Sequence, residues 1–196
     1  MFYSKLRTTL ARFKRGEEGS IAVETAIIVP MLFWVFLSTL SIFHAYRQHS
    51  ISQKAGYTIG DMISRETNPI DRTYMVGAQK LLQFLTLADL QDTTIRVSSV
   101  KYNLPDNKYE MNWSKVQGNA KNEFTQSEVA GLTGRLPIMK DNEHIIVVET
   151  WVDYDPPFDT GLATHDVVNF VFTRPRYTPH RSVGINVAAE GHASQL

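Results

Sequence analysis

The feature that most constrains this chain is a long apolar run near its amino end. The residues from Ile21 to Phe43 contain one charged side chain, Glu24. As an α-helix this run would be about 35 Å long, enough to cross the roughly 30 Å hydrocarbon core of a bilayer. It exceeds the roughly 7–15 apolar residues of a signal-peptide core. The sequence therefore predicts one membrane-spanning helix, which we place at residues 20–46.

The basic residues around this run predict its orientation. Residues 1–19 hold five basic and two acidic side chains, whereas the whole chain has 20 of each sign. Lys and Arg are enriched on the cytoplasmic side of membrane helices. We therefore expect residues 1–19 to be a basic cytoplasmic leader peptide and the chain beyond the span to be exported. No concentrated basic surface is predicted, so a nucleic-acid partner is not expected.

The start of the apolar run carries an unusual pattern. Glu24 is a lone acid in a lipid-length segment, which is costly unless the acid has a role. It is the fifth residue after Gly19, a small residue placed directly before Ser20 and the run. Pro30 follows, where it removes one helical hydrogen bond and is expected to kink the helix. A generic signal anchor that tolerates one acid is the simpler reading of the same residues.

Together these features resemble the amino-terminal signature of the TadE-like family. Its members are minor pilins or pseudopilins of tight-adherence (Tad/Flp) type IV pilus assembly systems. The matching elements are the basic leader, Gly19, the sequence Ala-Val-Glu-Thr-Ala at residues 22–26, and Pro30. The resemblance covers residues 16–60 and is weaker toward the end of that range.

The resemblance implies a structural role and a processing step. A prepilin peptidase would cut after Gly19 and make Ser20 the new amino terminus. Glu24 would then be the fifth residue of the mature chain and would pair with the free amine of a neighbouring subunit. The implied partners are the membrane, the prepilin peptidase, other pilins and the Tad assembly-platform proteins. The implied location is the bacterial inner membrane, single-pass with a periplasmic carboxyl-terminal domain, or an extracellular pilus.

Two positions depart from the wider pilin pattern. Ser20 stands where most type IV prepilins have Phe or Met after the glycine, which leaves its effect on processing open. Thr25 stands where the major Flp pilin has Tyr. The resemblance therefore favours a minor subunit over the bulk subunit of the fibre.

Residues 47–180 are expected to form the exported domain, with a flexible tail at 181–196. Apolar residues repeat with helical spacing in its first part, where Asp71 is a candidate helix cap. Beyond residue 92 the apolar period changes to two, as in half-buried strands. We predict an α+β fold: a long pilin-like amino-terminal helix continuing into a small domain of helices on an antiparallel sheet. The predicted segments are helices at 44–65, 71–89 and 127–132, and strands at 94–102, 109–116, 143–154 and 167–173.

Sites for other chemistry are weakly indicated. Asp153, Asp155 and Asp159 lie in a proline-containing loop and are a weak calcium candidate, although solvated loop charges fit them better. No nucleophile elbow, phosphate loop or dinucleotide fingerprint is present, and there is no cysteine. We therefore expect no enzymatic activity, no resident metal and no cofactor.

Two alternative functions share parts of this pattern. One is a signal-anchored periplasmic domain that binds a ligand or catalyses a reaction. The other is a secreted protein cleaved after the apolar run, for which an Ala-x-Ala site near its end would be needed. Residues 44–46, His-Ala-Tyr, do not supply one.

Overall fold

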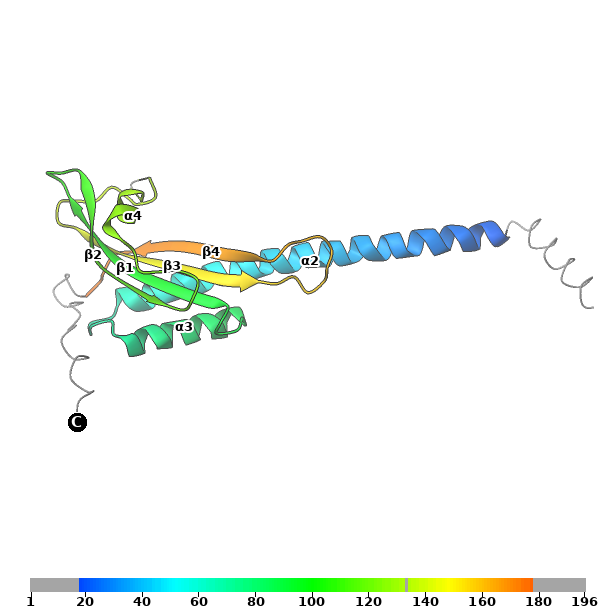
Figure 1. Cartoon of the computed structure of the whole chain (residues 1–196), viewed down its shortest axis with the longest axis horizontal. Helices are drawn as coiled ribbons and strands as arrows, with labels where there is room; N and C mark the ends of the chain where they lie inside the picture. Colours follow the sequence, from blue (N-terminus) through cyan, green and yellow to red (C-terminus); the bar gives the residue numbers. More distant parts are fainter. Residues whose placement is uncertain (1–17, 133, 178–196) are drawn as a thin grey trace, which may run out of the picture. The chain divides into compact units, whose positions relative to one another are not determined.

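The computed structural model describes residues 18–132 and 134–177 (Figure 1). The chain divides into two compact units. The first contains the helix up to Ala45 and the loop Pro156–Ala163. The second contains Tyr46–Asp155 and the chain from Thr164 onward. The predicted tail at 181–196 and most of the predicted leader lie outside the described residues.

Helix α2 (Glu18–Ser64) runs from the apolar segment into the second unit. Within that unit its buried side chains recur every three or four residues, as one helix face against a core requires. These side chains are Ser52, Ala55, Ile59 and Ile63. The helix expected at residues 44–65 is confirmed as part of α2.

Helix α3 (Arg72–Thr86) begins at the predicted cap. The Asp71 carboxylate accepts a hydrogen bond of 2.7 Å from the Tyr74 amide, which satisfies one of the free donors of the first turn. The helix ends earlier than the predicted residue 89. Leu87 adopts a left-handed backbone conformation with φ of 56°, which stops the helical hydrogen-bond pattern.

Four antiparallel strands form one sheet in the order β2-β1-β3-β4. The strands are β1 (Thr93–Asn103), β2 (Lys108–Gln117), β3 (His144–Tyr154) and β4 (His165–Thr173). All four were predicted from the two-residue apolar period. The sheet with its helices confirms the α+β class and the long apolar helix that precedes it.

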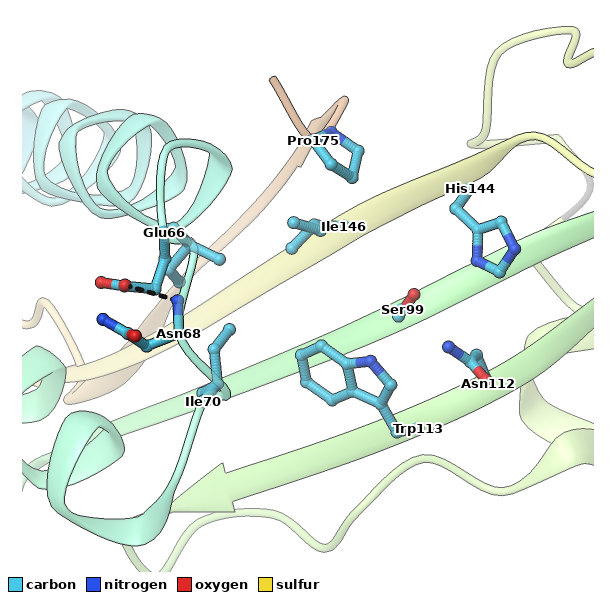
Figure 2. A pocket seen from close by; sticks show the side chains of 10 residues that line it. Glu66, Asn68, Ile70, Ser99, Asn112, Trp113, His144, Ile146 and Pro175 are labelled. Atoms are coloured by element: carbon cyan, nitrogen blue, oxygen red, sulfur yellow. Dashed lines mark hydrogen bonds between the residues drawn. The ribbon is translucent and has the colours of Figure 1, made fainter. Parts of the chain in front are cut away.

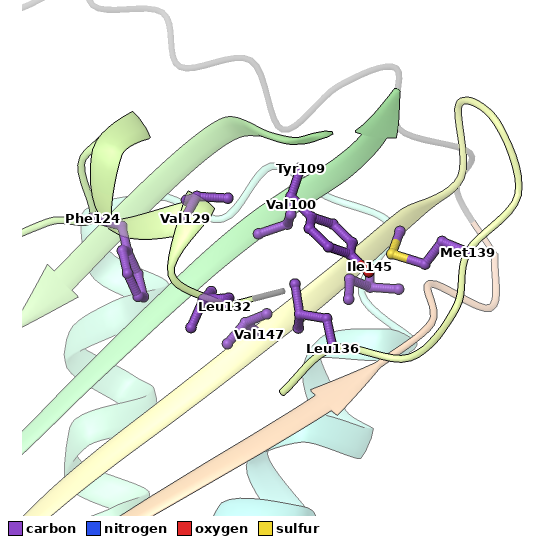
Figure 3. Packing of buried hydrophobic residues seen from close by; sticks show 9 residues of the cluster. All are labelled: Val100, Tyr109, Phe124, Val129, Leu132, Leu136, Met139, Ile145 and Val147. Carbon is purple, nitrogen blue, oxygen red and sulfur yellow. The ribbon is translucent and has the colours of Figure 1, made fainter. Parts of the chain in front are cut away.

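Each face of the sheet is covered by different elements. Helix α3 contacts β1 and β2 on one face (Figure 1). The opposite face carries the short helix α4 (Gln126–Ala130) and the chain that follows it. Figure 3 shows the apolar cluster beneath these segments. Its buried members are Val100, Tyr109, Phe124, Val129, Leu132, Leu136, Met139, Ile145 and Val147.

Two glycines let α2 approach β4 closely. A Cβ atom at Gly60 would lie 3.3 Å from a Val171 methyl carbon, and one at Gly56 would lie 3.5 Å from the other methyl. Glycine lowers helix propensity, so sequence alone makes this stretch a weaker helix. Here the missing side chains are what allow the helix to pack against the strand.

We predict that Gly60→Leu destabilises the domain by about 1–3 kcal/mol, because the added side chain overpacks the contact with Val171. Gly77→Leu in α3 is the matched control, since a Cβ there has no neighbour within 4 Å. Gly77→Leu should raise the free energy of unfolding by up to about 1 kcal/mol, because leucine has a higher helix propensity than glycine. Urea unfolding of the full-length chain in detergent, followed by near-ultraviolet circular dichroism, measures both. Equal stability of the two variants would contradict the packing role of Gly60.

Candidate functional site

The first unit consists largely of an apolar helix whose side chains are exposed. Within the described chain, α2 is the one helix long and apolar enough to cross a membrane. Its amino-terminal half buries little of that apolar surface against the protein, so the helix needs another apolar surrounding. The large exposed side chains of this stretch are Ile21, Val23, Ile27, Ile28, Val29, Met31, Leu32, Phe33, Trp34, Val35, Phe36, Leu40, Ile42 and Phe43.

Two hydroxyl groups in this stretch are satisfied by the helix itself. The Ser38 hydroxyl donates to the Trp34 carbonyl at 2.9 Å, and the Thr39 hydroxyl donates to the Val35 carbonyl at 2.9 Å. Such bonds to the preceding turn let Ser and Thr enter lipid at low cost. These residues therefore need no external polar partner.

Glu24 differs from these residues in charge and in partners. Its side chain is exposed on α2, and no side chain placed in the described part of the chain forms an ion pair or hydrogen bond with it. A charged carboxylate in a membrane helix is costly, up to about 2.5–3.5 kcal/mol at the helix centre on insertion scales. The charged carboxylate of Glu24 therefore calls for a partner from outside the described residues.

The other predicted site residues lie on the same helix. Gly19 and Ser20 are within the first turn of α2, and Ser20 precedes Glu24 by four residues. Residues four apart lie on one helix face. α2 continues through Pro30 as helix, and the kink expected there stays a prediction.

The predicted calcium candidate does not form a metal-binding group. In residues 18–132 and 134–177, no three or more His, Asp or Glu side chains are placed to hold a metal ion. Asp153 and Asp155 are exposed at the end of β3, and Asp155 accepts a hydrogen bond of 3.1 Å from the Thr164 hydroxyl. Asp159 is also exposed. All three carboxylates are exposed in the structure.

A buried ion pair lies in the sheet, and the sequence reading did not identify it. Arg96 on β1 and Glu149 on β3 face each other across the strands, with a closest nitrogen–oxygen distance of 2.6 Å. Burial raises the pKa of Glu149 above its ordinary value, and the positive charge of Arg96 opposes that shift. Arg96 stands between Ile95 and Val97, and Glu149 directly follows Val148. Two opposite charges inside apolar parts of predicted strands are the signal that could have found the pair.

The surroundings of Arg96 hold the guanidinium in place. It donates a 2.9 Å hydrogen bond to the Asn122 carbonyl and lies 3.7 Å from the centre of the Phe124 ring. The side chains of Arg96 and Glu149 are 9% and 7% exposed, so a substrate has little access to either. A perturbed carboxylate can mark a catalytic site, but this one is enclosed and paired. We assign the pair to the support of the sheet.

A small cavity lies on the face of the sheet that α3 covers (Figure 2). Ser99, Trp113 and His144 line it from the strands, and Glu66 lies at its helical edge. One Glu66 carboxylate oxygen accepts hydrogen bonds from the Thr67 and Asn68 amides, each at 3.0 Å. The cavity volume is about 40 Å³, room for a few water molecules. The cavity does not have the size of a small-molecule site.

Comparisons of the chain with protein-family models, with curated proteins and with solved structures gave no match. The candidate functional site is therefore defined by the molecule itself. It consists of the exposed apolar stretch of α2 with Glu24 near its start, preceded by Gly19 and Ser20. This arrangement can insert into a bilayer and offer one carboxylate to a cationic partner.

We predict that Arg96→Met destabilises the domain by about 3–5 kcal/mol near neutral pH, because it leaves the Glu149 carboxylate buried without a partner. The loss should shrink as the pH falls. Burial keeps the folded-state pKa of Glu149 above its unfolded value, so the folded protein takes up a proton first and the penalty is relieved.

Urea unfolding of the full-length chain at about pH 7 and about pH 4.5 measures this difference. The double variant Arg96→Met/Glu149→Leu is the control and should recover most of the lost stability, since both charges are gone. A loss that is equal at both pH values, with no recovery in the double variant, would show that the charge on Glu149 is not the cause.

Proposed function

We propose that this chain is a minor pilin or pseudopilin of a Tad (Flp) type IV pilus assembly system, as its TadE-like amino-terminal pattern suggests. The observation that carries the proposal is the placement of Glu24. This carboxylate lies on an exposed, membrane-length apolar helix, five residues after Gly19 and without a described partner. A lone acid with that spacing has a defined use in a subunit that is processed and then assembled.

The proposed processing step creates the partner that Glu24 needs. A prepilin peptidase cleaves the peptide bond after Gly19, and Ser20 gains a free amino group. That ammonium is small, cationic at neutral pH and fixed to the end of an apolar helix. An ammonium and a carboxylate that meet in an apolar site offset each other's desolvation cost, whereas each alone would be stranded.

The same pairing gives direction to assembly. Before assembly, the chain's own amine can reach Glu24, because the two groups are four residues apart on one helix. In the assembled state the amine comes from a neighbouring subunit, so the ion pair joins two helices at a fixed axial offset. The apolar residues around Glu24 then pack against other subunits or against lipid.

The remaining parts of the proposal follow from this topology. The leader stays in the cytoplasm, the apolar half of α2 crosses the bacterial inner membrane, and the α+β domain is periplasmic. Prepilin peptidase, other pilins and the Tad assembly platform are the proposed partners. The role is structural, and it requires neither a cofactor nor a catalytic residue.

A signal-anchored periplasmic domain with a ligand or enzymatic activity is the alternative. It shares the apolar helix but has no use for cleavage at Gly19 or for the carboxylate of Glu24. A ligand site usually has a cavity of about 300–1,000 Å³. The cavity beside Trp113, at about 40 Å³, gives that alternative no support.

We predict that Gly19→Leu blocks processing, because a bulky residue does not fit the proposed scissile position. Gly16→Leu is the matched control in the same leader and should leave processing intact. Intact-mass measurement in cells with an active prepilin peptidase should show the leader retained in the first variant and removed in the second. A wild-type protein that begins at Met1 in such cells, or that lacks its apolar segment, would refute the proposal.

We also predict that Glu24→Ala and Glu24→Gln are processed and inserted but fail to assemble, since neither offers a negative charge to the neighbouring amine. Thr25→Ala, one residue away and also exposed, is the control and should assemble normally. Recovery of each variant with sheared pili or with co-purified pilins measures assembly. Wild-type recovery of Glu24→Ala would remove this carboxylate from the mechanism.

A further inference from the structure

One face of the apolar helix is covered although the rest of it is exposed. Ser41 is 0% exposed, while Leu40, Ile42 and Phe43 beside it are at least 40% exposed. Leu37 and Ala45, each one turn away from Ser41, are partly buried. A single helix cannot bury its own outward side chain, so another segment of the chain lies on this face.

The segment grouped with this part of the helix is the loop between β3 and β4. Residues Pro156–Ala163 form one compact unit with the amino-terminal part of α2, separate from the rest of the domain. Figure 1 shows this loop alongside α2, where the yellow strand turns into the orange one. Because Ser41 is the fully buried residue of that helical part, we take the loop to lie beside Ser41.

We propose that this loop rests in the outer interface of the bilayer and contacts lipid headgroups. The inference depends on the proposed membrane-spanning role of α2. Irregular backbone does not occur in lipid-exposed hydrocarbon, because its amide groups would lack partners. The hydrocarbon boundary must then lie no farther out than the loop. The residues from Ile21 to Leu40 form about 30 Å of helix, which matches the hydrocarbon thickness.

The composition of the loop suits the interface. Phe158 is 37% exposed and Leu162 is partly buried, so the loop offers an aromatic ring and an aliphatic side chain at the depth where amphipathic segments insert. Asp159 is exposed and can remain hydrated among the headgroups. The turn is closed by its own backbone, since the Thr160 amide donates to the Phe158 carbonyl at 2.9 Å.

The consequence is a second contact between the protein and the membrane. The loop contacts the bilayer beside the helix. The protein is then anchored both by the apolar part of α2 and by the loop Pro156–Ala163. Insertion of Phe158 also explains why an aromatic residue between prolines and acids is left exposed.

Spin labelling of the full-length chain in liposomes tests this placement. The chain has no cysteine, so Phe158→Cys, Ile28→Cys and Ile138→Cys each give one labelled site. Ile28 is the hydrocarbon reference, and Ile138, which is 96% exposed on the domain, is the aqueous reference. The ratio of oxygen to nickel-chelate collision rates reports the depth of each nitroxide.

We expect the ratio at position 158 to lie severalfold above that at 138 and below that at 28. A ratio at 158 equal to that at 138 would overturn the interface contact while leaving the span intact. An aqueous ratio at position 28 would overturn both the span and the loop placement. Pro157→Cys, at a neighbouring exposed position, repeats the measurement if Phe158→Cys does not fold.

Discussion

A single helix must satisfy two different surroundings, and this constraint organises the whole molecule. In its first half α2 exposes nearly all of its apolar side chains, which is stable only in lipid or against other helices. In its second half the apolar side chains turn to one face and enter a protein core. The change happens within one continuous helix, α2.

Charged side chains in apolar surroundings need a partner of opposite charge. The sheet carries Arg96 and Glu149 side by side, because each would be unstable if buried alone. The apolar helix carries Glu24 with no partner in the described residues, and the proposed cleavage after Gly19 supplies one. The domain pairs its buried charge internally, whereas in the proposed assembly the charge of Glu24 on the apolar helix pairs between subunits.

Much of the fold could be predicted from the order of apolar residues. The change from a helical period to a two-residue period near residue 92 located the sheet, and Asp71 marked the start of α3. Features that depend on contacts between distant residues are harder to predict from sequence. Gly56 and Gly60 lower the helix propensity of this stretch, yet their missing side chains let α2 pack closely against Val171. The partner of Arg96 lies 53 residues away, so the pair depends on strand register.

The same limit applies to the site. The sequence alone indicated Gly19, Glu24 and the length of the apolar run, because all of them lie in one short segment. The structure places this segment on one helix. The loop beside Ser41 was readable only as a polar turn, because its packing against α2 joins residues more than a hundred positions apart. Local pattern therefore predicted the helix that carries Gly19 and Glu24, but it did not predict that the loop Pro156–Ala163 packs with that helix.

The most direct test of the account is to trap the partner of the Glu24 carboxylate. A hydrophobic carbodiimide joins a carboxylate to an amine that touches it, and mass spectrometry of the digested assembly identifies the two peptides. The account predicts an amide bond between Glu24 and the terminal amine of a second, processed subunit. Glu24 recovered only unmodified, or only as a carbodiimide adduct without a joined amine, would contradict it.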